Sequence, residues 1–257
     1  MARVVSGSAP AAGQPATLAA VSPASSALRV TVAALPSAVV QALTARRIEG
    51  VILQADARTP AQLIVAADGD RWVLRGADGD ERGGVVAGDA AALGRALRNE
   101  ALAYSLASLD NPGRPFTLDF AFGEPRNAFR LGEAVGFRIR SARGGYLTVV
   151  DVAPGGEVNV LYPNSYDRDN RVEPGQELTL PTPAMPFEFR VQEPLGRGVV
   201  RAFVTQRPLE LTLDDGGDTV SALLAALRAA AGPPPVPGDA LPVDTWATSY
   251  VIYDFTR

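Results

Sequence analysis

The chain has 257 residues, and its 24 basic side chains are all arginines because the sequence contains no lysine and no histidine. Cysteine is also absent, which excludes thiolate nucleophiles and disulfides. The absence of lysine excludes Schiff-base lysines, and the absence of histidine excludes imidazole bases and, with that of cysteine, ordinary zinc sites. The net charge of −4 provides no general attraction for nucleic acid or anionic lipid. We therefore expect no cofactor and no nucleic-acid partner.

Residues 1–27 are rich in alanine, proline, serine and glycine, and are predicted to be a disordered leader. They contain no apolar block of the size that a secretory signal needs. No stretch reaches the ~18 apolar residues of a membrane span, so no membrane insertion is expected. The sequence does not identify one cellular compartment. A soluble chain is cytoplasmic as the sequence stands, or periplasmic or envelope-associated if an upstream export signal is missing.

Residues 28–110 mix strand-like and helix-like patterns, which predicts a small α/β domain. Segment 28–32 alternates as a strand does, and Pro36 then opens a helical pattern. Asp89 is positioned to cap a second helix that runs to about Leu109. Short strands are also predicted at residues 51–53, 63–66 and 72–74, with Asp-Gly turns at 68–69 and 78–79.

Residues 111–257 are predicted to form an antiparallel β-sandwich, because short alternating segments are separated by proline and glycine. Segments 135–139, 146–152 and 158–162 are expected to form a three-stranded antiparallel meander. Other strands are predicted at residues 116–120, 178–180, 187–191, 199–204 and 209–213. The fold class is therefore α+β: a small α/β domain followed by an antiparallel β-sandwich with one packed helix.

The packed helix is predicted at residues 219–231, where Asp218 provides a cap and the apolar positions have helical spacing. We expect it to cover the sandwich edge or the domain junction. The proline-rich residues 232–242 are expected to be an extended spacer, and residues 245–255 a terminal strand.

Residues that could support catalysis or metal binding are better explained by structure. Acidic segments 214–218 and 166–170 offer oxygens to Ca²⁺. The first is explained by a helix cap and a solvated turn. The second lacks the glycine and the bidentate glutamate of an EF-hand loop. Ser141 and Ser165 have no histidine or lysine to act as a base. We predict no catalytic, cofactor-binding or metal-binding residue.

Aromatic residues at strand ends are mostly expected in the core. Tyr162 and Tyr166, next to Pro163 and Asn164, are the two that we expect to be exposed. The candidate partner-binding loop therefore consists of Tyr162, Asn164 and Tyr166.

Several short motifs follow one another in a recognisable order in the second half of the chain. They are Phe129–Phe137, Ser141, Gly145–Leu147, Asp151–Val152, Val160–Asn164, Pro174–Gly175, Pro186–Phe189 and Glu193–Gly196. With them, residues 116–211 resemble a bacterial domain family of unknown function that usually lies carboxyl-terminal to caspase-like peptidase domains. The preceding segment, which ends at Leu109–Pro112, resembles the region that joins such a peptidase to this domain. The peptidase itself is absent, since its cysteine and histidine are missing, and no catalytic residue is carried over.

The resemblance implies a noncatalytic accessory, recognition or regulatory module that acts by protein–protein binding. Its implied partner is a caspase-like peptidase domain, in cis or in trans. One alternative is a carboxylate-based glycan hydrolase, because the chain has 28 acidic residues from which a catalytic pair could come. The other is a cell-envelope structural protein, because members of the family are often linked to the envelope.

Overall fold

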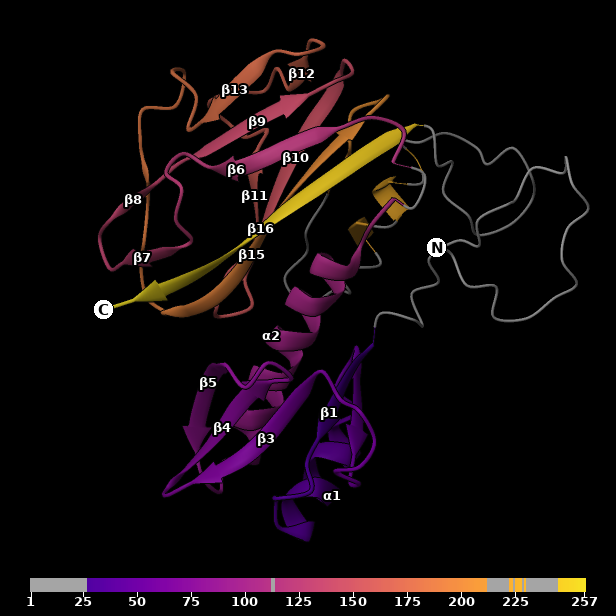
Figure 1. Cartoon of the computed structure of the whole chain (residues 1–257), viewed down its shortest axis with the longest axis vertical. Helices are drawn as coiled ribbons and strands as arrows, with labels where there is room; N and C mark the ends of the chain where they lie inside the picture. Colours follow the sequence, from indigo (N-terminus) through magenta and orange to yellow (C-terminus); the bar gives the residue numbers. More distant parts are fainter. Residues whose placement is uncertain (1–26, 112–113, 212–221, 224, 228, 230–244) are drawn as a thin grey trace, which may run out of the picture.

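The computed structural model describes residues 27–111, 114–211, 222–223, 225–227, 229 and 245–257. It is β-rich, with two separate β-sheet regions and few helices (Figure 1). The predicted fold class, an α+β fold with a β-sandwich, is confirmed. In the part of the chain that is described, no helix is long and apolar enough to span a lipid bilayer.

The first region is a five-stranded sheet with its helices packed on one face. Strand β1 pairs in parallel with β2 and β3, and the remaining pairs, β3–β4 and β4–β5, are antiparallel. The spatial order is β2-β1-β3-β4-β5. The sequence did not predict β5, since its Glu-Arg-Gly-Gly start has little strand propensity. The elements are β1 (Leu28–Thr31), α1 (Ser37–Arg46), β2 (Val51–Gln54), β3 (Leu63–Asp68), β4 (Arg71–Gly76) and β5 (Glu81–Val86).

Helix α2 (Ala90–Ser108) begins at the predicted cap. The Asp89 carboxylate accepts hydrogen bonds from the backbone N–H groups of Ala91 and Ala92, at 3.0 and 2.8 Å. These donors would otherwise have no partner within the helix. We expect Asp89→Ala to lower the free energy of unfolding by about 1 kcal/mol, as measured by urea denaturation. Asp89→Asn is the control, because an amide oxygen can keep the cap. An equal loss in both variants would contradict the capping role.

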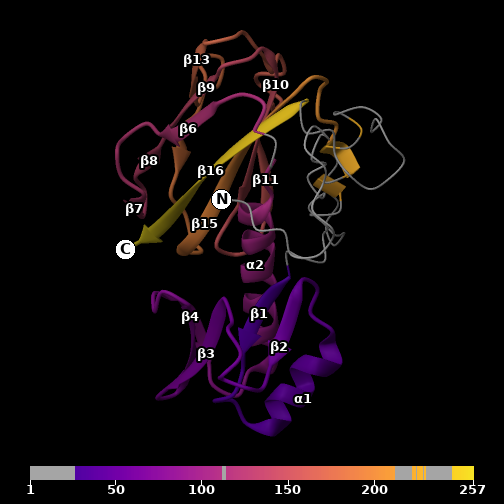
Figure 2. The same cartoon turned by 45° about the vertical axis from the view of Figure 1, so that its right-hand side comes forward.

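Helix α2 also joins the two regions of the molecule (Figure 2). Its first half places Leu93 and Leu97 in the core of the small sheet. Its second half places Leu106 in a different cluster, formed with the outer face of the sandwich. Because one continuous helix contributes to two hydrophobic cores, the two regions are linked by burial as well as by the chain.

The second region is a β-sandwich. One layer is a six-stranded sheet in the order β11-β10-β15-β16-β7, with β12 paired to β10. The opposite layer consists of the sheet β13-β9-β6 and the ribbon β14-β8. Its strands are β6 (Leu118–Phe122), β7 (Ala128–Arg130), β8 (Ala134–Val135), β9 (Phe137–Ser141), β10 (Gly145–Val152), β11 (Val158–Tyr162), β12 (Arg171–Val172), β13 (Glu177–Leu180), β14 (Phe189–Arg190), β15 (Gly196–Thr205) and β16 (Trp246–Thr256).

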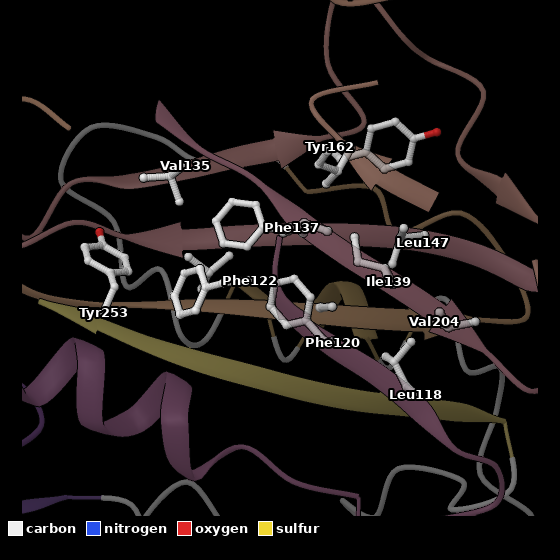
Figure 3. Close-up of a cluster of buried hydrophobic side chains, with 14 of the residues drawn as sticks. Leu118, Phe120, Phe122, Val135, Phe137, Ile139, Leu147, Tyr162, Val204 and Tyr253 are labelled. Carbon is white, nitrogen blue, oxygen red and sulfur yellow. The ribbon is translucent and has the colours of Figure 1, made fainter. Parts of the chain in front are cut away.

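The predicted meander is wrong in one of its three strands. Strands β10 and β11 form the expected antiparallel pair. Strand β9, however, pairs with β6 and β13 in the opposite layer. The chain therefore crosses between the layers after Ser141, so that the buried side chains of β9 face those of β10 across the core (Figure 3). The expected continuation at residues 209–213 also fails, because its described part, residues 209–211, is not a strand.

The carboxyl-terminal part of the chain contains helical residues and the strand β16. Residues 222–223, 225–227 and 229 are helical, and Leu223 and Leu227 are buried beside the second half of α2 on the outer face of the six-stranded sheet. The terminal strand is confirmed as β16. Three predictions lie outside the described residues: residues 1–26 of the leader predicted at 1–27, the Asp218 cap, and the spacer at 232–242.

Two arginines on β15 hold the two regions together. The Arg201 side chain is 1% exposed, and its guanidinium donates to the carbonyl oxygens of Leu106 and Ala107, the latter at 2.8 Å, at the end of α2. Arg197 pairs with Asp254 of β16 at 2.9 Å and lies 3.7 Å from Asp80, in the turn before β5. These contacts place cationic groups at a helix carboxyl terminus and against the first sheet.

Candidate functional site

The predicted partner-binding loop is built on a buried tyrosine. Tyr162 is 2% exposed, and its hydroxyl donates to the carbonyl oxygen of Asp169 at 2.6 Å. In Figure 3 the hydroxyl points away from the centre of the core cluster. Burial, together with the carboxylates of Asp167 and Asp169, raises the pKa of Tyr162 to about 12. The expected exposure of Tyr162 is therefore wrong, because its ring closes the core at the end of β11.

Asn164 organises the same loop. Its Oδ1 accepts the N–H groups of Tyr166 and Asp167, at 2.9 and 3.1 Å, and its Nδ2 donates to the carbonyl oxygen of Leu161. The hydroxyl of Thr182 holds the Asp167 carboxylate at 2.6 Å. Because these bonds use both ends of the amide, Asn164 shapes the loop rather than facing a partner.

Tyr166 is the exposed member of the three, with 58% of its surface accessible. Its ring meets that of Phe187 edge to face, with the ring centroids 5.3 Å apart, and the centroids of Phe187 and Phe189 are 5.7 Å apart. Phe189 in turn lies 6.2 Å from Phe137 in the core. We call Tyr166, Phe187 and Phe189 the aromatic row. Phe187 is 37% exposed, although the sequence had favoured a core position for it.

The aromatic row leads to a cavity of about 260 Å³ between the six-stranded sheet and the β14-β8 ribbon. Four aromatic rings line it, together with aliphatic side chains and a small number of polar groups. The lining residues are Val135, Phe137, Asp151, Leu161, Glu188, Phe189, Arg190, Gln192, Val200, Tyr253 and Phe255. An apolar cavity with a few convergent polar groups is typical of a binding site.

Asp151 is the unusual group in this cavity. It lies on β10 on the same face as Leu147 and Val149, which point into the sandwich. Its Oδ1 accepts a hydrogen bond from the hydroxyl of Tyr253 at 3.0 Å, from the far strand β16. Figure 3 shows Tyr253 at one end of the buried cluster. A carboxylate at a core-facing position requires a compensating role, because burial penalises its charge.

The surroundings of Asp151 make its ionisation less favourable than that of an exposed carboxyl, although a pKa near 6 leaves it mostly ionised at neutral pH. Burial raises the pKa of Asp151 to about 6, while hydrogen bonds from Tyr253 and Asn159 act in the opposite direction and the charge of Glu157 adds to the rise. Burial and the nearby carboxylate also raise the pKa of Tyr253. Strongly shifted pKa values in a cavity mark candidate functional groups.

Neither Asp151 nor Tyr253 was predicted as a site residue. The available signal was the period of the strand: in the alternation of residues 147–151, position 151 falls on the buried face and carries a charge. Tyr253 had no such signal, since 102 residues separate it from Asp151 and only the pairing of β15 with both strands brings them together.

The other candidate sites have structural explanations where they are described. Asp167 and Asp169 accept hydrogen bonds from Thr182 and from the backbone of Arg171. Ser141 is buried and donates to the carbonyl oxygen of Arg143 at 2.6 Å. Segment 214–218 lies outside the described residues. No group of three or more acidic side chains suited to a metal ion occurs within the described ranges.

The sequence comparisons concern the sandwich. No curated protein sequence matches the chain. A family model with the description "Domain of unknown function (DUF4384)" matches residues 128–208, from the start of β7 to just beyond β15. This match is shorter than the resemblance at residues 116–211, and it includes Asp151, Tyr166 and Phe187 but not Tyr253. Residues 128–208 are therefore similar to the DUF4384 family, a domain of unknown function.

Proposed function

We propose that this chain is a noncatalytic recognition module that binds a protein partner through the aromatic row. The observation that carries this proposal is the pair Tyr166 and Phe187, two large aromatic side chains in edge-to-face contact that are 58% and 37% exposed. Tyrosine and other aromatic side chains contribute a large share of binding energy at protein interfaces.

The loop that presents these rings is held in place before any partner arrives. Asn164 and Thr182 fix its backbone and its acidic side chain. Phe189 anchors the other end of the row against Phe137 in the core. A surface that is ordered in advance loses less conformational entropy on binding, which supports a recognition role.

The partner in this proposal is a caspase-like peptidase domain, in cis or in trans, because residues 116–211 resemble a family that adjoins such peptidases. A regulatory role would follow if the aromatic row docks beside the peptidase active site. The net charge of −4 supports a protein partner over nucleic acid.

Replacing either exposed ring should weaken this association. We expect Tyr166→Ala and Phe187→Ala each to raise the Kd for a purified caspase-like peptidase at least tenfold, measured by isothermal titration calorimetry. Ile64→Ala is the matched control, because Ile64 is 42% exposed on β3, in the first sheet. Absence of binding by the unmodified chain at micromolar concentrations would overturn the proposal.

One observation supports a second candidate, the carboxylate-based glycan hydrolase. Asp151 and Glu188 line the same cavity, and the pKa of Asp151 is raised as that of a general acid would be. Against this, Glu188 is paired with Arg190 and most of the cavity wall is apolar. Turnover of any member of a polysaccharide panel, lost in Asp151→Asn, would favour the hydrolase over the recognition module.

A further inference from the structure

We propose that the cavity next to the aromatic row receives the ε-ammonium group of a lysine side chain from a protein partner. This inference rests on the proposed function, and it specifies which group the partner inserts. The partner's backbone would lie across Tyr166 and Phe187, and its lysine would enter beside Phe189.

Aromatic rings form a large part of the cavity wall. The rings of Phe137, Phe189, Tyr253 and Phe255 all line the cavity. Tyr253 and Phe255 stack with their centroids 4.1 Å apart. The faces of aromatic rings attract cations, and several rings around one space form the cages that recognise alkylammonium groups. The aliphatic lining can pack against the methylene stem of the lysine.

The charges in the cavity also favour a cationic ligand. Three charged side chains line the cavity: Asp151, Glu188 and Arg190. Arg190 is ion-paired with Glu188 and also donates to the carbonyl oxygen of Gly132 at 2.9 Å. Asp151 makes no salt bridge with any residue that the structure describes. Its neighbours are Tyr253, Asn159 and the acidic Glu157. The cavity therefore offers a negative charge to a cation and repels an anion.

The hydrogen bonds of Asp151 favour lysine over arginine as the ligand. The Asp151 carboxylate already accepts the Tyr253 hydroxyl and a hydrogen bond from Asn159, so it does not present two free oxygens to a planar guanidinium fork. An ammonium group is a compact point donor that one oxygen and surrounding rings can satisfy. The volume of about 260 Å³ leaves room for an unbranched alkylammonium chain.

The small probe for this site is Nα-acetyl-lysine N-methylamide, titrated into the full chain and followed by NMR. We expect saturable binding with a Kd in the millimolar range, on the order of what so small a ligand can reach. The matched norleucine and Nε-acetyl-lysine compounds should bind at least tenfold more weakly, because they lack the charge. Equal binding of all three, or equal binding of the arginine analogue, would overturn the assignment.

Two variants locate the site. Asp151→Asn keeps the shape and the acceptor for Tyr253 but removes the charge, so lysine-probe binding should fall at least tenfold. Asp119→Asn removes the same charge from the exposed face of β6 and should leave it unchanged. Binding that survives in Asp151→Asn would place the ammonium elsewhere and overturn the proposal.

The absence of lysine from this chain makes a protein-level test selective. Acetylation removes the positive charge of the peptidase's lysines, and any reagent carried into the mixture finds no lysine in this chain. We expect acetylation to weaken the complex at least tenfold. If the unmodified peptidase binds but neither acetylation nor Asp151→Asn changes its affinity, the lysine site is wrong and the recognition module stands. If the lysine probe binds but the peptidase does not, the site stands and the proposed partner is wrong.

Discussion

Asp151→Asn should make the protein more stable at neutral pH while removing its proposed ligand site. Burial raises the pKa of Asp151 from the ordinary 3.8 to about 6. Each unit of difference between the folded and unfolded states corresponds to about 1.4 kcal/mol. Because Asp151 retains some solvent contact, we expect a gain of about 2 kcal/mol in the free energy of unfolding at pH 8. The amide can still accept the Tyr253 hydroxyl, so the hydrogen bond is kept.

The pH dependence of this gain has a definite sign. Below about pH 4 the carboxyl is protonated in both states, so the burial of charge costs nothing and the variant gains nothing from removing it. Between about pH 4 and 6 the unfolded chain ionises first, and the unmodified protein loses stability as the pH rises. The loss is complete about one pH unit above the pKa of the folded state, near pH 7. Urea denaturation at pH 4, 5, 6, 7 and 8 measures this curve, with Asp119→Asn as the control. An Asp151→Asn variant that is less stable at pH 8 would show that the carboxylate serves the fold.

Arg201→Met should weaken the contact between the end of α2 and the six-stranded sheet, and so lower the free energy of unfolding. The guanidinium is 1% exposed and bonds two carbonyl oxygens at the end of α2 and the hydroxyl of Thr248 at 2.8 Å. Burial lowers the pKa of Arg201 to about 10, so it is still charged at neutral pH. Methionine retains the bulk but removes the hydrogen bonds of the guanidinium, and the Leu106 carbonyl then keeps only the N–H of Leu109, at 3.2 Å, among the described donors. We expect a loss of about 2–4 kcal/mol in the free energy of unfolding.

Hydrogen exchange identifies where that stability is lost. In Arg201→Met, the amides in the last two turns of α2 should exchange faster than those around Leu93, at the other end of the helix. Arg138→Met is the control, since Arg138 is exposed on β9. A variant as stable as the unmodified protein would mean that the desolvation cost of Arg201 cancels its hydrogen bonds.

Much of the fold follows from local chemistry that the sequence states directly. Asp89 predicted the start of α2, because a short acceptor before an apolar helical pattern satisfies its first N–H groups. Alternation predicted strands within residues 28–32, 116–120 and 135–139, because side chains on a strand alternate between core and solvent. The absence of lysine, histidine and cysteine defined which side chains are available at any site.

The pairing of distant strands decided the other features of the fold. Alternation within one strand does not say which strand lies next to it or which aromatic side chains the neighbouring elements bury. Because of this pairing, β9 lies in the opposite layer, and Tyr162 is buried while Tyr166 is exposed. Helix α2 likewise contributes side chains to two hydrophobic cores. The strand pairing also brought Tyr253 to Asp151 across 102 residues of sequence. The composition of the chain thus limited the chemistry that the site can use. Only the packing of β10, β15 and β16 against the opposite layer placed a carboxylate within an aromatic cavity, because burial and contact are properties of the assembled sheets.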